Sequence, residues 1–161
     1  KGNNSIGEFR SISLTKNFQQ IDTGSKMIHI GKNTKSLIIS KGISTNYSKN
    51  TYRGLVKINK KANYSKNYTQ CDSLLIGNKC STYTYPNIIS MNKNSKIEHE
   101  STISKIEDEQ IFYCNQRGLS KEIAMSIIVS GFSYNIINKL PLEFAIEAKE
   151  LLNLEIENAV G

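Results

Sequence analysis

The amino-acid sequence predicts a mainly β fold, a solenoid of short strands, followed by a small helical region. Apolar bursts, each roughly four to six residues long, recur through residues 1–105 and are closed by Gly, Asn, Ser or Lys. The spacers between these bursts are too short for helical periodicity, which argues against alternating strand–helix units. Gly-Asn and Gly-Lys-Asn corners recur after the bursts, and Asn tolerates the left-handed backbone of repeated turns. These corners favour a solenoid over a sandwich or a barrel, which stay open as alternatives.

The expected strands follow one another along residues 1–105. Met27–Ile30 and Leu37–Ile39 flank the corner that begins at Gly31. Leu55–Ile58 comes next, and the later bursts lie in the stretches "CDSLLIGNKC", "NIISMNKN" and "KIEHESTISKI". Ile and Thr are abundant in these bursts, and both fit the pleated surface of a sheet. We therefore expect residues 1–105 to form the β region.

The period changes at about residue 106. The stretch "EDEQIFYCNQRG" has acidic residues first and Arg117-Gly118 last, an order that suits a helix dipole and a glycine at the C-terminal cap. Ser120 is then a candidate N-cap for a second helix, with Glu122 in its first turn. We expect residues 106–161 to form a helical C-terminal domain.

Two further helices are expected to present apolar faces. In the second helix, Ile123, Ile127 and Ile128 are spaced to share one face with Ala124. Pro141 is placed near the start of a third helix. That helix has an apolar stripe made of Phe144, Ala145, Ala148, Leu151 and Leu152.

Several classes of protein do not fit the composition. No stretch approaches the run of about 18 apolar residues expected of a membrane helix. The sequence begins at Lys1 without a visible leader, and we interpret it as part of a longer protein. Three cysteines, without a CxxC motif, predict neither a disulfide framework nor a self-contained zinc site. A reducing compartment is expected, where a cysteine is structural, metal-binding or reactive.

The net charge of +7 is divided unevenly along the chain. Residues 1–105 hold 17 Lys and Arg against 5 Asp and Glu, a net charge of +12, whereas residues 106–161 hold 4 against 9. Such asymmetry is compatible with a nucleic-acid surface. However, 18 of the 21 basic residues are Lys, which A/T-rich coding also produces, and Arg is the residue preferred for reading bases and phosphates. We therefore do not expect nucleic-acid binding.

Cys71 and the stretch around His99 are the candidates for chemistry. In a strand, the side chain of Cys71 shares a face with Ser73 and lies opposite Asp72, and a half-buried packing role is the competing interpretation. Alternation likewise places Glu98 and Glu100 on one face and His99 on the other. Charges on an exposed strand edge often serve only to prevent pairing. Cys, His and Glu are also side chains that bind iron or zinc, and one or two coils would bring Cys71 and His99 together.

The remaining cysteines and histidine are assigned structural roles. His29 has no acidic or cysteine neighbour in the sequence. Cys80 and Cys114 are expected to be packing residues, with Cys114 on the first helix.

The stretches "YTQCDSLLIGNKC" and "IEHESTISKIEDEQIFYCNQRGLS" resemble the SufB/SufD family of iron–sulfur cluster assembly proteins of the SUF system. The likeness is to the C-terminal third of SufB-type members. It continues in the same order through "QQIDTGSKMIHIGKNTKSLIISKGIS", "YRGLV" and "LPLEFAIEAKELL", so that it covers nearly the whole chain. The resemblance implies a right-handed parallel β-helix over residues 1–105 and a helical C-terminal domain over 106–161.

The resemblance also implies a site. The essential cysteine of the family falls on Cys71, and its cluster-proximal acids and imidazole fall on Glu98, His99 and Glu100. Metal ligation by Cys71, His99 and Glu100 is implied, with Cys71 also the chemically active residue. SufD-type members lack the cysteine and the flanking acids, so the pattern is of the SufB type. A set with one cysteine should hold a cluster more weakly than thiolates alone, which suits a scaffold that passes its product on.

The resemblance implies partners and a compartment as well. A transient iron–sulfur cluster would form at the β-helix edge, against a SufD-type paralogue or a second SufB chain. The helices, from about Pro141 to Leu154, would dock on a SufC-type ATPase, so that ATP acts only through that partner and the chain itself is no enzyme. The Lys-, Asn- and Ile-rich composition points to a plastid of the apicoplast type, and otherwise to the cytoplasm. The alternatives are a structural SufD-like subunit without cluster ligands and a basic nucleic-acid-binding β module.

Overall fold

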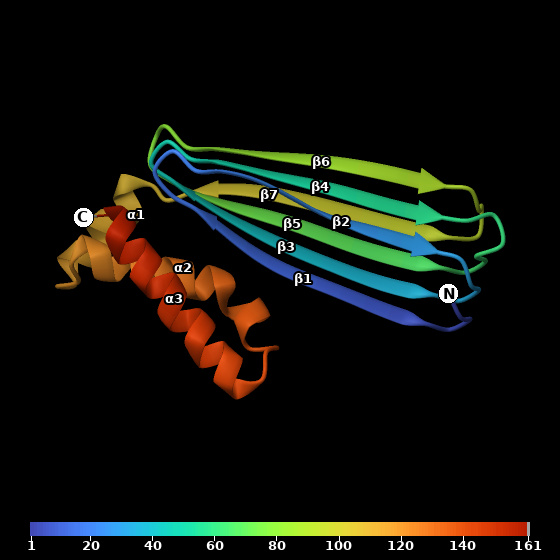
Figure 1. Cartoon of the computed structure of the whole chain (residues 1–161). Helices are drawn as coiled ribbons and strands as arrows, with labels where there is room; N and C mark the ends of the chain where they lie inside the picture. Colours follow the sequence, from blue (N-terminus) through green and yellow to red (C-terminus); the bar gives the residue numbers. More distant parts are fainter. Residues whose placement is uncertain (161) are drawn as a thin grey trace.

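The computed structural model describes the backbone of residues 1–160 and the side chains of residues 1–156. Seven strands come first and three helices follow (Figure 1). The strands are β1 (Ile6–Thr15), β2 (Gln20–His29), β3 (Lys35–Thr45), β4 (Lys49–Ile58), β5 (Lys66–Ile76), β6 (Ser81–Ser90) and β7 (Lys96–Lys105). The helices are α1 (Asp108–Gln116), α2 (Lys121–Ile137) and α3 (Leu142–Val160).

The strands form a parallel β-solenoid of two facing sheets. One sheet has the order β1-β3-β5-β7 and the other the order β2-β4-β6, so consecutive strands alternate between the sheets. Every pairing is parallel, and paired residues are one coil apart: Ile6 lies beside Lys35, and Lys35 beside Lys66. The solenoid expected from the sequence is therefore confirmed, and parallel pairing distinguishes it from a sandwich of hairpins.

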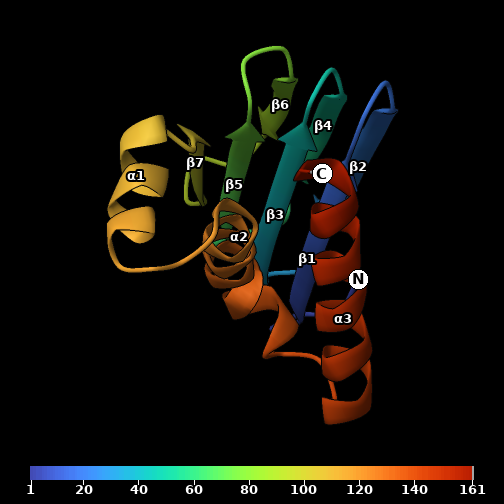
Figure 2. The same cartoon turned by 90° about the vertical axis from the view of Figure 1, so that its left-hand side faces the viewer.

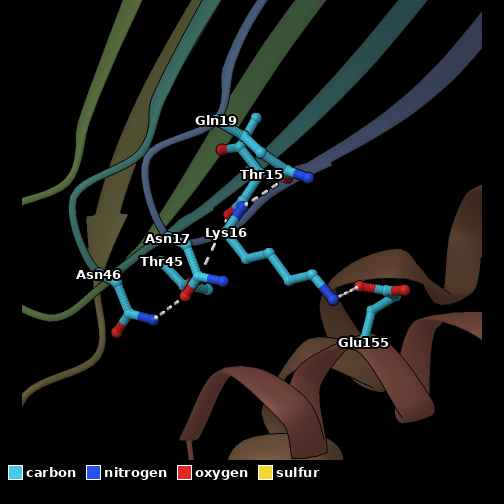
Figure 3. Close-up of polar contacts among 7 residues, drawn as sticks. All are labelled: Thr15, Lys16, Asn17, Gln19, Thr45, Asn46 and Glu155. Carbon is cyan, nitrogen blue, oxygen red and sulfur yellow. Dashed lines mark hydrogen bonds and ion pairs between the residues drawn. The ribbon is translucent and has the colours of Figure 1, made fainter.

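Left-handed residues make the corners, as the Asn-rich spacers predicted. Asn17, Asn46 and Gly77 have positive φ angles at the turns that follow β1, β3 and β5. The stacked corners contact one another, because the Asn46 side-chain amide donates to the Asn17 Oδ1 atom at 3.2 Å (Figure 3). Tyr64, with a φ of 59°, is an unexpected member of the equivalent set at the opposite corners.

The space between the sheets holds an apolar cluster and a polar network. Ile38, Tyr52, Val56 and Cys71 are buried together, with Phe9, Met27 and Ile97 packed against them. Inward-facing hydroxyl and amide groups bind one another between coils, for example Ser11 with Ser40 at 3.1 Å and Asn67 with Ser36 at 2.8 Å. These hydrogen bonds offset the cost of burying polar side chains.

The helices pack on the outer face of the β1-β3-β5-β7 sheet. A second core joins Ile43, Leu74 and Ile76 of the sheet to Met125 and Val129 of α2, and it also includes Ile156 of α3. Figure 2 shows α2 in front of β3 and β5, and α3 in front of β1. One end of this face is therefore covered by helices.

The helix boundaries agree with the sequence signals. A capping box at Glu107 begins α1, and Gly118, with a φ of 81°, follows its end. The Ser120 side chain accepts a hydrogen bond from the Ile123 N–H and caps α2. Pro141 directly precedes α3. Among the described residues, no helix has the length and apolar character needed to cross a membrane.

Two expected helix faces are corrected by the structure. Of the expected α2 face, Ala124 is buried and Ile128 packs against the core, but Ile123 and Ile127 are 51% and 55% exposed. The helix docks through a neighbouring face that adds Met125 and Val129. In α3, Ala145, Ala148 and Leu152 are partly covered, while Phe144 and Leu151 face solvent. Helical spacing located apolar side chains without showing which of them the sheet would cover.

Candidate functional site

The solenoid brings Cys71 and His99 together on the inner face of one sheet. Cys71 lies on β5 and pairs with Ser101 of β7. His99 pairs with Thr69, which lies two residues before Cys71 on the same face of β5. The Cys71 Sγ atom lies 3.9 Å from the His99 Nε2 atom. A single coil therefore closes the separation between these residues in the sequence.

The Cys71 thiol is buried and holds its proton. Its residue is only 3% exposed, in the apolar cluster with Ile38, Tyr52 and Val56. Burial, and to a smaller extent the negative charge of Asp72, raise the pKa of Cys71 to about 11. At neutral pH the group is therefore a thiol, in contact with the Nε2 atom of His99. Cys71 is thus a packing residue and a potential ligand at once.

Glu98 and Glu100 lie on the opposite face of β7. Glu98 forms an ion pair with Lys96, and a Glu100 carboxylate oxygen accepts a hydrogen bond from the Tyr68 hydroxyl at 2.9 Å. The alternation of side chains along a strand separates these acids from His99, as the sequence predicted. The set of Cys71, His99 and Glu100 is therefore not assembled on one face.

No group of three His, Cys, Asp or Glu side chains is placed to hold a metal ion within the described part of the chain. The Cys71–His99 pair supplies two possible metal ligands. The Glu98 and Glu100 carboxylates lie on the other face of β7, so they could reach a metal ion at this pair only around the edge of that strand. Because β7 pairs only with β5 among the described strands, it forms the edge of its sheet. An additional chain at this edge would meet both faces.

The last coil leaves apolar residues open at this end of the solenoid. Ile88 of β6 is 46% exposed and Ile103 of β7 is 57% exposed, although both continue inward-facing rows, since Ile88 pairs with buried Val56 and Ile103 with buried Ser73. Exposed strand edges with apolar side chains are templates for pairing with another chain. His99 lies on the edge strand β7 itself, and Cys71 lies one strand further in, on β5.

Tyr68 is a site residue that sequence reasoning missed. Its hydrogen bond to Glu100 raises the pKa of the Tyr68 phenol above its ordinary value. The residue pairs with Glu98 across β5 and β7, and only the register reveals that it reaches Glu100. Tyr68 therefore fixes one of the two outward carboxylates.

His29 has the structural setting that the sequence indicated. Its ring nitrogens contact the Thr34 Oγ1 atom at 2.6 Å and the Ser36 Oγ atom at 2.8 Å. Burial lowers the pKa of His29. It belongs to the interior polar network and lies outside the Cys71–His99 pair.

Comparison with known proteins bears on what this arrangement does. Residues 1–132 match the family described as "SUF system FeS cluster assembly, SufBD core domain". Over 160 residues the chain is 62% identical to the iron–sulfur cluster assembly SufBD family protein ycf24 of Antithamnion sp. and 59% identical to that of Galdieria sulphuraria. It is 52% identical over 161 residues to the chloroplastic SufBD family protein ABCI8 of Arabidopsis thaliana.

These alignments include nearly all of the chain but only part of its relatives. They cover 99% of the chain in the two algal cases and 100% in the plant case. The same alignments cover 54% of the Antithamnion protein, 72% of the Galdieria protein and 29% of the Arabidopsis protein. The chain thus spans about half the length of the first of these relatives.

Proposed function

Because the chain belongs to the SufBD family of iron–sulfur cluster assembly proteins, we propose that it is a scaffold subunit on which a cluster is built and then released. The observation that carries the proposal is the Cys71–His99 pair, 3.9 Å apart beside an open solenoid edge. The cluster is a transient substrate of this scaffold. The chain itself is not an enzyme.

Cys71 and His99 alone are an incomplete set of ligands for a cluster. Stable iron–sulfur clusters are usually held by several Cys thiolates. Cys71 and His99 supply only one thiol and one imidazole, and Glu100 can contribute a carboxylate only from the other face of the edge strand. A nascent cluster would therefore be bound weakly and would need ligands from a second chain. Weak binding suits a protein that transfers its product.

Cys71 must lose its proton before it binds iron, because the thiolate is the ligand. His99 Nε2 is the adjacent base, and the proton passes from the Cys71 sulfur to that nitrogen. Burial opposes this transfer by favouring the neutral thiol. If the edge opened and exposed Cys71 to water, the pKa of its thiol would fall and the thiolate would form more readily. Deprotonation of Cys71 and access to it are therefore linked.

The open edge of β6 and β7 is the proposed contact for a SufD-type paralogue or a second SufB-type chain. Its strands offer unpaired backbone groups, and Ile88 and Ile103 offer apolar surface. Strand addition would extend the sheets and cover both. The partner's side chains would then lie next to Cys71 and His99.

The helical region, residues 106–161, is the proposed docking domain for a SufC-type ATPase. Between Pro141 and Leu154, α3 exposes five large apolar side chains: Leu142, Phe144, Ile146, Leu151 and Leu154. Ile123 and Ile127 of α2 are exposed as well. Large apolar side chains left exposed on a helix are candidates for protein contacts. ATP would be bound and hydrolysed by the partner, whose movements the helices would receive.

A plastid stroma is the proposed compartment. The similarity to a chloroplastic plant protein supports it, together with the Lys-, Asn- and Ile-rich composition. An apicoplast-like plastid fits that composition.

The test is anaerobic loading of the chain and a SufD-type partner with iron and sulfide, followed by visible absorption. Cys71→Ser and His99→Ala are expected to abolish the absorption, and Glu100→Ala to weaken it. Cys114→Ser is the matched control, because Cys114 is a partly buried cysteine on α1. Loading of Cys71→Ser at the wild-type level would refute the scaffold assignment and favour a structural SufD-like subunit.

A further inference from the structure

A lysine lies buried between the sheet and α2, on β3, the strand next to the one that carries Cys71. Lys41 of β3 is 8% exposed, although lysine is almost never fully buried. Its Nζ atom donates a hydrogen bond to the main-chain carbonyl oxygen of Phe132 in α2 at 2.7 Å. The same ammonium lies 4.5 Å from the centre of the Phe132 ring. Lys41 thus binds the helix through two groups of one residue.

The same ammonium also reaches β5. It lies 3.7 Å from the Asp72 Oδ2 atom, and Asp72 is the register partner of Lys41. Asp72 Oδ2 also accepts a hydrogen bond from the Gln70 side-chain amide at 2.8 Å. Gln70 and Asp72 flank Cys71 in the sequence, on the outward face of the strand. The ammonium of Lys41 on β3 therefore links α2 to the side chain of Asp72, which in turn binds the side chain of Gln70 on the other side of Cys71.

Stability does not account for a buried charge at this position. The next row of the sheet places Leu14, Ile43 and Leu74 side by side, and they pack under the helices as ordinary apolar core. A buried ion pair is commonly no more stabilising than apolar side chains of similar volume. Unlike apolar packing, however, the Lys41 contact is directional, because the ammonium donates its hydrogen bond to a single carbonyl of α2. Apolar packing permits a helix to slide, whereas this contact specifies one position.

We propose that Lys41 is a positioning residue that couples the place of α2 to the access to Cys71. While α2 is docked, Lys41 holds Asp72 and keeps β5 closed over the buried thiol. A displacement of α2 withdraws the ammonium from Asp72, leaves the Asp72–Gln70 pair without its cation, loosens β5 around Cys71 and opens the thiol. This inference rests on the proposed function, in which Cys71 is the ligand and the helices receive movements of a partner.

The experiment measures how fast Cys71 is alkylated by iodoacetamide in the full chain, with each cysteine resolved by mass spectrometry. Low urea concentrations are used, where local opening dominates over global unfolding. Lys41→Met, which keeps the apolar stem, is expected to accelerate Cys71 alkylation about tenfold, equivalent to about 1.4 kcal/mol. Lys41→Arg, which keeps a charged donor, is expected to stay near the wild-type rate.

Charge alone would act in the opposite direction. Removal of a cation beside Asp72 raises the pKa of the neighbouring thiol and slows alkylation. Acceleration in Lys41→Met therefore reports opening of the strand. The readout separates positioning from a simple electrostatic effect.

The matched control is Lys16→Met. Lys16 forms an ion pair with Glu155 and so also links the solenoid to a helix, but it contacts α3 from the turn after β1 (Figure 3). Its loss is expected to leave the Cys71 rate unchanged. An equal acceleration in Lys16→Met, or none in Lys41→Met, would overturn the proposal.

A double variant protects the test against loss of the fold. Lys41→Met leaves the Asp72 carboxylate without its cation, which can destabilise the chain. If circular dichroism shows that Lys41→Met is unfolded, Lys41→Gln/Asp72→Asn removes both charges together and is compared with Asp72→Asn alone, because loss of the Asp72 charge by itself lowers the pKa of Cys71 and speeds its alkylation. The double variant is then expected to be alkylated faster than Asp72→Asn, and an equal rate in the two would overturn the proposal. The assay contains no iron, sulfide or partner, so its outcome is independent of whether the chain assembles a cluster.

Discussion

The Tyr68 hydroxyl donates a hydrogen bond to Glu100 at 2.9 Å and thereby joins β5 to the edge strand β7 on the outside of the solenoid. On the inside, the same two strands place Cys71 beside His99. The edge of the sheet thus has a fixed carboxylate on one face and a buried thiol–imidazole pair on the other. A chain that pairs with β7 would meet these groups from both sides.

The hydrogen bond to Glu100 is the largest cause of the raised pKa of Tyr68. Glu100→Gln is therefore expected to lower the pKa of the Tyr68 phenol toward its ordinary value, because an uncharged amide no longer disfavours the phenolate. Ultraviolet absorption of tyrosinate during an alkaline titration measures the change. Tyr68→Phe identifies which part of the titration belongs to Tyr68.

Glu98→Gln is the matched control, since Glu98 affects the pKa of Tyr68 least of the named charges. An equal shift in both variants would contradict the assigned hydrogen bond.

The buried thiol of Cys71 should make the chain less stable in alkali. The folded chain retains the thiol proton up to about pH 11, while the unfolded chain releases it near pH 9.0. Between these values the unfolded state binds fewer protons, so rising pH favours unfolding and the free energy of unfolding falls. Cys71 alone contributes a loss of about 2 to 3 kcal/mol across this range.

Urea unfolding of the wild-type chain and of Cys71→Ala from pH 8 to pH 11 isolates this contribution. The difference between the two free energies should change with pH, because Cys71→Ala removes only the thiol. A constant difference over the whole range would show that burial does not raise the pKa of Cys71.

The exposed face of α3 should matter for partner binding and little for folding. Phe144→Ala and Leu151→Ala change side chains that are 60% and 55% exposed, so the free energy of unfolding should move by less than about 0.5 kcal/mol. Affinity for a SufC-type ATPase, measured by calorimetry, should fall at least about tenfold if they lie at the centre of the contact.

Tyr83→Ala is the comparison variant for this surface. Tyr83 is 46% exposed on β6, away from the helices, and its loss should leave ATPase affinity unchanged. Equal losses of affinity in all three variants would place the contact elsewhere.

The left-handed corners predict opposite effects of two substitutions on stability. Tyr64, with a φ of 59°, has a backbone conformation that is strained for an aromatic residue, so Tyr64→Asn should stabilise the chain by about 0.5 to 1 kcal/mol. Gly77, with a φ of 104°, should tolerate Ala poorly, with a loss of about 1 to 2 kcal/mol. Thermal unfolding measures both, and stabilisation by Gly77→Ala would contradict the assigned corner geometry.

The β character of residues 1–105, the Asn corners and the helix boundaries could be predicted because each depends on neighbours in the sequence. The strands themselves are ten or eleven residues long rather than four to six, and β1 was not among the expected ones. Asn17 and Asn46 follow apolar bursts, and Ser120 precedes a helical pattern. Alternation along one strand was enough to separate His99 from Glu98 and Glu100.

Contacts between coils could not be predicted because they depend on register. Ile6 pairs with a residue 29 positions later, but Lys35 pairs with one 31 positions later. This irregular repeat hides the partnership of Lys41 with Asp72 and the reach of Tyr68 to Glu100. The exposed side of α2 was equally hidden, since its sequence is apolar on more than one face and docking decides which is covered.

The contact of α3 with the turn after β1 has a consequence for how the chain folds. Solenoids behave as one-dimensional arrays, in which each coil contacts only its neighbours and terminal coils can fray independently. The Lys16–Glu155 ion pair and the packing of Ile156 in the helix–sheet core tie the end of the sequence back to the coil of β1 and β2. The helices can complete these contacts only after β1, β3 and β5 are aligned, so they convert a coil-by-coil array into a single cooperative unit.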